Sequence, residues 1–167
     1  MMKQLKTLVI AAAIAFFGTQ TINAQAKVAH VDVNELMSKM PAMLEAQGQL
    51  KKLSETYDKD YKTMVDEYQV KIKKYDTEAS TVSEAINQTR QTEVQDMIKR
   101  INDFKETAQS DLQKKEGDLM KPLLEKVKAS IQKVGKLKGY QYVLNATDLL
   151  LTDGPDLTAD VKKDLGF

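Results

Sequence analysis

A stretch of 68 consecutive residues without glycine or proline, from Gln49 to Glu116, constrains this chain more than any other feature. The stretch is rich in Lys, Glu, Asp, Gln and Ala, a composition that strongly favours helix. Apolar residues recur along it at steps of three and four, which average about 3.6 residues, the period of an α-helix. The pattern therefore predicts long helices, each with one narrow apolar stripe on an otherwise charged surface.

A helix with a single apolar stripe is not stable alone in water, so its stripe must pack against another. One stripe occupies residues 50–86 and a second occupies 94–134, and we predict that they pack together as an α-helical hairpin. The tip is expected within 77–83, where Ser and Thr cluster, with Thr81 and Glu84 as a capping box that begins the return helix. An unbroken helix through this region is the alternative.

Prolines and a glycine mark the two ends of the hairpin. Pro41 suits the first turn of the ascending helix, where its missing N–H has no partner to lose. Gly117 and Pro122 predict an interruption of the return helix, with a bend near Leu119. We therefore assign residues 41–118 to a helical arm.

The flanks of the arm, residues 27–40 and 119–167, have the pattern of a small β-containing body. Residues 27–33 alternate between two faces, as a strand does. Residues 140–144 and 149–151 are also β-rich, and the polar segment between them predicts the turn of a hairpin. The first strand is expected to pair with this hairpin.

The body that these segments can build is small. Asp156 can cap a last short helix that ends near Leu165. Three short strands and some helix ends bury too little apolar area to be stable alone. Self-association is the natural remedy, because it joins the sheets of several protomers.

The first 26 residues have the order of regions found in a secretory signal peptide. Lys3 and Lys6 precede an apolar run, Leu8–Phe17, and small residues follow, so that cleavage after Ala24 or Ala26 would fit. The apolar run is too short to span a bilayer, which takes about 20 residues. A buried N-terminal helix is the alternative. The signal peptide predicts a soluble, exported protein.

Composition excludes several classes of protein. The chain has no Cys and a single His, His30, which removes thiolate sites and most His-based catalytic or metal constellations. Its 25 basic residues against 24 acidic ones argue against a nucleic-acid-binding protein. No catalytic motif or phosphate loop is present, so we expect no enzyme and no cofactor or metal. His30 is read as an ordinary strand residue, with a pH switch as the alternative.

The residues after the signal peptide resemble the OmpH/Skp family of periplasmic chaperones over essentially their whole length. The resemblance rests on the order and spacing of several segments, which are 28–36, 79–85, 119–127, 138–144 and 156–161. It implies a mostly α fold with a small β-body, in which the long α-helical hairpin is inserted between strands of a trimerising, β-barrel-like body. It also implies a homotrimer whose hairpins, the tentacles, enclose unfolded outer-membrane proteins.

One departure from the family pattern concerns charge. Residues 58–118 carry 11 basic and 14 acidic groups, whereas the resemblance implies strongly cationic tentacles. The basic excess lies in 119–138 instead, and its candidate electrostatic zone comprises Lys126, Lys128, Lys133 and Lys136. A solvated face is the alternative. No Lys or Arg can be matched to a lipopolysaccharide site, so contact with lipopolysaccharide or a membrane is left open.

Two further groups of residues are singled out. The candidate core of the trimer body comprises Val31, Val33, Tyr142 and Leu144. Four tyrosines share the ascending stripe as candidate contacts for unfolded clients, namely Tyr57, Tyr61, Tyr68 and Tyr75. Packing against the return helix, with the hydroxyls reaching solvent, is the alternative for these tyrosines.

The function predicted on these grounds is that of an ATP-independent periplasmic holdase, which encloses unfolded outer-membrane proteins and prevents their aggregation. Its partners would be those clients and two further copies of the chain. The alternative is an exported coiled-coil scaffold or spacer of the cell envelope that binds one folded partner.

Overall fold

The computed structural model describes residues 26–167. The predicted signal peptide lies outside this range apart from its last residue, Ala26. The elements follow the chain in the order β1 (Val28–Val31), α2 (Val33–Lys39), α3 (Pro41–Glu78), α4 (Glu84–Leu137), β2 (Tyr142–Asn145), the short 3-10 helix η1 (Ala146–Asp148) and α5 (Thr158–Leu165).

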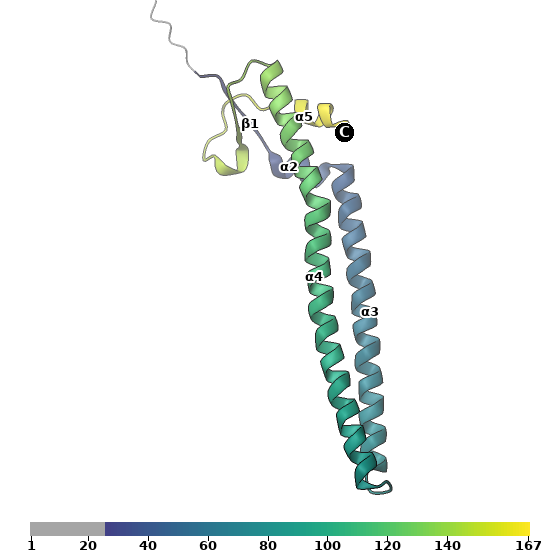
Figure 1. Cartoon of the computed structure of the whole chain (residues 1–167). Helices are drawn as coiled ribbons and strands as arrows, with labels where there is room; N and C mark the ends of the chain where they lie inside the picture. Colours follow the sequence, from purple (N-terminus) through teal and green to yellow (C-terminus); the bar gives the residue numbers. More distant parts are fainter. Residues whose placement is uncertain (1–25) are drawn as a thin grey trace, which may run out of the picture.

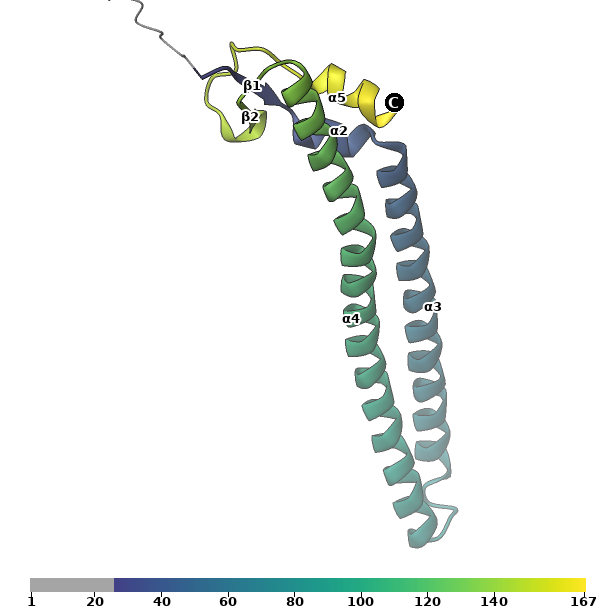
Figure 2. The same ribbon diagram turned by 45° about the horizontal axis from the view of Figure 1, so that its top comes forward.

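A long antiparallel pair of helices, α3 and α4, dominates the molecule (Figure 1). The two helices lie side by side along their length in both views, and the remaining elements gather at one end as a small body (Figure 2). The predicted helical hairpin is therefore confirmed. At 1.5 Å per residue, α3 alone is roughly 57 Å long, so the arm extends far beyond the body.

The tip of the arm falls where the Ser/Thr cluster predicts it, because α3 ends at Glu78 and α4 begins at Glu84. The predicted cap was wrong by two residues. Ser83, not Thr81, is the N-cap, and its hydroxyl accepts a hydrogen bond from the Ile86 N–H. The Thr81 hydroxyl instead donates to the carbonyl of Glu78, which closes the end of the preceding helix.

The predicted interruption of the return helix does not occur, because α4 runs through Gly117 and Pro122 without a break. A proline removes one backbone donor and crowds the preceding turn. At Pro122 this cost falls on a single hydrogen bond, with Leu123 and Val127 packed in the core just beyond it. Packing of the flanking turns outweighs that local cost.

The sheet consists of two parallel strands, with Val28 of β1 opposite Tyr142 of β2 and Val31 opposite Asn145. Parallel strands need a long crossover connection, and here the whole arm supplies it. On its other side, β1 bonds to the segment before α5, since His30 donates to the carbonyl of Pro155 and accepts from the N–H of Leu157. β1 is therefore central, and β2 lies at an edge.

Two strand predictions were wrong. The first strand ends at Val31, because Asp32 caps α2 by accepting a hydrogen bond from the Glu35 N–H at 2.8 Å, and so Val33 belongs to a helix. No strand forms at 149–151, and the predicted hairpin is absent from the described residues. There the side chain of Asn145 donates hydrogen bonds to the side chains of Thr147 and Asp148 in η1, and such local bonds compete with a strand ladder.

The core lies where α2, α4 and α5 meet beneath β1. Its largest fully buried side chains are Val31, Leu36, Val127 and Val161, one from each of these elements. The predicted cap of the last helix was wrong by one residue, because Leu157 is the N-cap of α5 and its side chain makes no capping bond. Asp156, just before it, accepts hydrogen bonds from the backbone and hydroxyl of Thr158. The core therefore joins both ends of the arm to the end of the chain.

Gly135 of α4 gives β2 room to pack on this helix. A Cβ at this position would lie 2.8 Å from a γ-carbon of Val143, which is closer than real contacts allow. Val143 is stiff at χ1 and cannot turn away without cost. The glycine therefore sets the distance between strand and helix.

We predict that Gly135→Ala lowers the free energy of unfolding by about 1 kcal/mol, because overpacking outweighs the gain in helix propensity. Gly117→Ala is the matched control, because its Cβ meets no atom within 4 Å. That change should raise the free energy of unfolding by about 0.5–1 kcal/mol through propensity alone. Urea unfolding followed by circular dichroism measures both. Equal stabilisation by the two alanines would contradict the packing argument.

Candidate functional site

The seam between α3 and α4 is built around tyrosines. The rings of Tyr57 and Phe104 meet edge to face with their centroids 5.9 Å apart. The Tyr57 hydroxyl donates to a carboxylate oxygen of Asp111 at 3.0 Å, and this hydrogen bond raises the pKa of the phenol. Tyr57 is therefore held neutral and fixed across the seam.

A second tyrosine ties the seam together near the tip. The Tyr75 hydroxyl donates to Glu93, which also pairs with Lys71, and the Arg90 guanidinium lies 4.5 Å from the centre of the Tyr75 ring. The ion pair with Lys71 and the bond from Tyr75 hold the pKa of Glu93 below its usual value. Arg90 also pairs with Glu78 on the opposite helix. The distal arm is thus closed by polar contacts that surround an aromatic ring.

The predicted client-contact tyrosines do not share one environment. Tyr57, Tyr68 and Tyr75 are half-buried in the seam, whereas Tyr61 is 39% exposed. Tyr61 and Tyr57 line an open groove of about 430 Å³ together with Phe104, Ala108 and Leu112 of α4. Seam packing therefore describes most of these side chains, and Tyr61 presents part of its ring to solvent.

Another open groove, of about 560 Å³, lies nearer the tip. Its apolar floor comes from Val70, which is 69% exposed, and from Met97, which is buried. The arm therefore carries apolar surface that is open to solvent at two places along its length.

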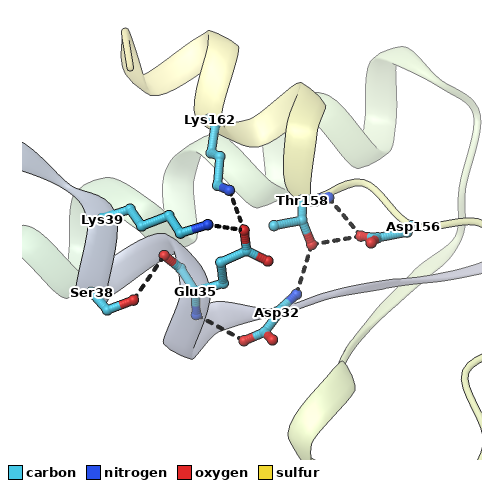
Figure 3. Close-up of polar contacts among 7 residues, drawn as sticks. All are labelled: Asp32, Glu35, Ser38, Lys39, Asp156, Thr158 and Lys162. Atoms are coloured by element: carbon cyan, nitrogen blue, oxygen red, sulfur yellow. Dashed lines mark hydrogen bonds and ion pairs between the residues drawn. The ribbon is translucent and has the colours of Figure 1, made fainter.

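A polar network holds the base of the arm to the body (Figure 3). Glu35 of α2 accepts from Lys39 on its own helix and from Lys162 of α5, and the Asp32 N–H donates to the hydroxyl of Thr158 at 2.9 Å. Hydrogen bonds from Lys162 and Lys39 lower the pKa of Glu35 to about 2. The network joins the entrance of the arm to the C-terminal helix.

The same C-terminal helix also contacts the exit of the arm. Asp164 accepts hydrogen bonds from Ser130 at 2.7 Å and from Lys133 at 2.5 Å, and Asp160 pairs with Lys138. The bond from Lys133 is the main cause of the lowered pKa of Asp164. Sequence reasoning missed these contacts, because no local pattern relates residues that lie 22 or more positions apart.

The predicted electrostatic zone is divided by these contacts. Lys133 is neutralised by Asp164, whereas Lys126, Lys128 and Lys136 are exposed and form no ion pair among residues 26–167. The remaining lysines therefore present net positive charge on the part of α4 nearest the body.

The residues predicted for the trimer core also lie in different places. Val31 is buried within the single chain, and Val33 packs against the same core from α2. Tyr142 and Leu144 are 59% and 42% exposed on the edge strand. His30, in the central strand, is buried and lies 4.0 Å from a carboxylate oxygen of Asp156.

Other kinds of site are not found in the described part of the chain. No group of three or more His, Cys, Asp or Glu side chains among residues 26–167 is placed to hold a metal ion. No helix there combines the length and the apolarity that crossing a membrane requires.

The fold and the sequence agree on one family. A family model described as outer membrane protein (OmpH-like) matches residues 27–165, which is most of the chain. The chain belongs to this family. The family is one of outer-membrane chaperones and is non-enzymatic, so the predicted resemblance and the prediction of no enzymatic activity are both confirmed.

A solved structure shares the fold. The crystal structure of a candidate OmpH-like outer membrane chaperone from Caulobacter crescentus CB15 superposes with a TM-score of 0.77 over 85% of each chain. The two sequences are only 13% identical, so this match concerns the fold alone. None of the curated proteins matches the chain at a significant level.

The lowered pKa of Glu35 predicts a specific loss of stability in acid. A carboxylate whose pKa falls on folding stabilises the folded state at any pH above its pKa in the unfolded chain, which is near 4.5 for Glu35. This contribution is lost as the pH falls from there through the folded-state pKa of about 2. Glu35→Gln should therefore unfold more readily at neutral pH and depend less on pH in this interval. Urea unfolding at a series of pH values measures this.

Glu55→Gln is the control for this experiment, because Glu55 is exposed on the arm and pairs only with Lys51 at 3.9 Å. It should follow the wild-type pH profile. A Glu35→Gln profile that also matches the wild type would show that the network does not stabilise the base of the arm.

Proposed function

We propose that the mature protein is an ATP-independent holdase of the periplasm, which holds unfolded outer-membrane proteins between its arms and so prevents their aggregation. The observation that carries the proposal is the arm itself. It is a two-helix projection roughly 57 Å long, joined to the body only at its base, with apolar grooves and a partly exposed tyrosine along its seam. Membership of an outer-membrane chaperone family supports it.

The arm suits a client that has no fixed shape. Its grooves are open and shallow, and apolar and charged side chains alternate along them. Many weak contacts of this kind hold an unfolded chain without selecting one conformation. Release then needs no chemical energy, because each contact breaks easily and the client leaves when a better partner takes it.

We further propose that three copies assemble through the body and enclose a cavity between their arms. β2 has a strand partner on one side only, and Tyr142 and Leu144 on it are exposed. The exposed apolar residues nearby are Val28, Leu137, Leu150 and Leu151. An apolar surface next to an open sheet edge is typical of an interface, since an uncovered edge invites pairing with another chain.

Export to the periplasm rests on the predicted signal peptide and fits the composition. A chain without Cys cannot form wrong disulfides in an oxidising compartment. Clients destined for the outer membrane would meet the protein there.

Light scattering with a urea-unfolded β-barrel protein tests the holdase function. A molar excess of the mature protein should suppress most of the aggregation that follows dilution, without added nucleotide. Unchanged scattering at excess chaperone would contradict the proposal. Mass spectrometry of proteins trapped on the arm then separates two classes of function, since many unfolded clients support a holdase and one stoichiometric folded partner supports a scaffold.

Sedimentation tests the assembly. Leu144→Asp should dissociate the trimer at micromolar concentration and leave the protomer folded, because this side chain is already 42% exposed in the single chain. Val31→Asp should dissociate it by unfolding the body, since it buries an unpaired charge in the core. Val70→Asp, on the exposed surface of the arm, is the control and should remain trimeric. A wild-type protein that sediments as a monomer would contradict the proposal that three copies enclose a cavity.

A further inference from the structure

The groove beside Tyr57 and Tyr61 has aromatic walls that are fixed in place. Tyr57 packs edge to face on Phe104 and is anchored by its hydroxyl to Asp111, so the ring cannot swing into the groove. Ala108 is buried and small, which leaves space between the helices beside Tyr61. The volume of about 430 Å³ accommodates one large side chain and the backbone on either side of it.

The charges around this groove are unbalanced. Asp58 and Glu116 line it, and Asp111 lies beside it through its bond to Tyr57. None of the three carboxylates forms an ion pair among the described residues, and the one lysine of the lining, Lys105, is also unpaired. Three carboxylates against one ammonium group leave this place net negative.

The groove nearer the tip shows the opposite arrangement. Asp66 pairs with Lys62, and Lys71 pairs with Glu93, while the remaining Glu67 and Lys74 carry opposite charges. Its charges therefore cancel, and its apolar part is aliphatic. Of these two grooves, the one beside Tyr61 combines aromatic walls with uncompensated negative charge.

We propose that this groove, which we call the Tyr61 groove, binds extended client segments in which an aromatic side chain stands next to a lysine or arginine. The inference rests on the proposed holdase function and adds the class of segment. The aromatic side chain of the client packs against Tyr57, Tyr61 and Phe104 in edge-to-face or stacked contacts. The neighbouring cation approaches Asp58 and Glu116, and attraction to these carboxylates selects basic segments over acidic ones.

This selection follows from the charge of this particular chain. The long-range attraction between client and arm depends on the sign of unpaired charges, and here the exposed positive surface lies lower on α4, at Lys126 and Lys128. An acidic segment is therefore drawn toward the body and a basic segment toward the middle of the arm.

Fluorescence anisotropy with two labelled peptides tests the proposal on the full mature protein. The peptides have the same length and the same phenylalanines, and they differ only in carrying lysine or glutamate beside each ring. At low salt the lysine peptide should bind about fivefold more tightly, which is the order expected for two exposed ion pairs. The preference should disappear in high salt, because salt screens exposed charges.

Three variants locate the binding. Asp58→Asn combined with Glu116→Gln should remove the preference while the glutamate peptide binds at least as well as before. Tyr61→Ser should weaken both peptides. Val70→Ala, in the groove whose charges cancel, is the matched control, and it should weaken both peptides less than Tyr61→Ser does and leave the preference for the lysine peptide unchanged. All four side chains are exposed, so these variants are expected to remain folded.

The outcomes separate this inference from the proposed function. Equal affinity for the two peptides, or an unchanged preference in the Asp58→Asn, Glu116→Gln variant, overturns the inference, even where the wild type still suppresses the aggregation of a whole client. Weakening by Val70→Ala equal to that by Tyr61→Ser overturns the placement in the Tyr61 groove. Failure to suppress aggregation with the peptide preference intact would count against the holdase function alone.

Discussion

The packing of α5 between the two ends of the arm is the constraint on which the rest of the structure depends. Val161 is fully buried between α2 and α4, and Lys162 and Asp164 extend from the same short helix to Glu35 on one side and Lys133 on the other. Each exposed ion pair alone contributes little. Together with the apolar core they fix where the arm enters and leaves the body. The arm, which carries the grooves and the tyrosines, is therefore held to the body through both of its helices.

The long helical hairpin was predictable because apolar residues recur along the chain with the period of an α-helix. A helical stripe repeated over many turns leaves a helical hairpin as its simplest partner, and tertiary packing cannot override so long a signal. The body was less predictable, because short β-rich runs do not determine pairing. Residues 149–151 failed to form a strand since Asn145 bonds to its own neighbours, and Val33 entered a helix since Asp32 caps it. The helix at Val33 could have been predicted, because Asp32 followed three residues later by Glu35 resembles a capping box.

The candidate site was predictable in kind and not in detail. Periodicity placed four tyrosines on one stripe, and the structure separates Tyr61, which is partly exposed, from three that are half-buried. Lys133 looked like part of a free basic zone, yet Asp164 neutralises it. Glu35 and Lys162 lie 127 positions apart, so only the folded chain brings them together. Charge composition is visible in sequence, but which charges remain unpaired is decided by tertiary contacts.

The parallel pairing of β1 with β2 has a consequence for the order of folding. Val28 pairs with Tyr142, which lies 114 residues later in the chain. The contacts between α3 and α4, in contrast, can form one after another, starting beside the five-residue tip and proceeding toward the body. Closing a loop through an unstructured chain of that length would be entropically costly and slow. Once the two helices zip together, their lower ends lie side by side and the strands become neighbours. The arm then acts as the scaffold on which the sheet of its own body forms, and a change that slows the pairing of α3 with α4 should delay formation of the sheet.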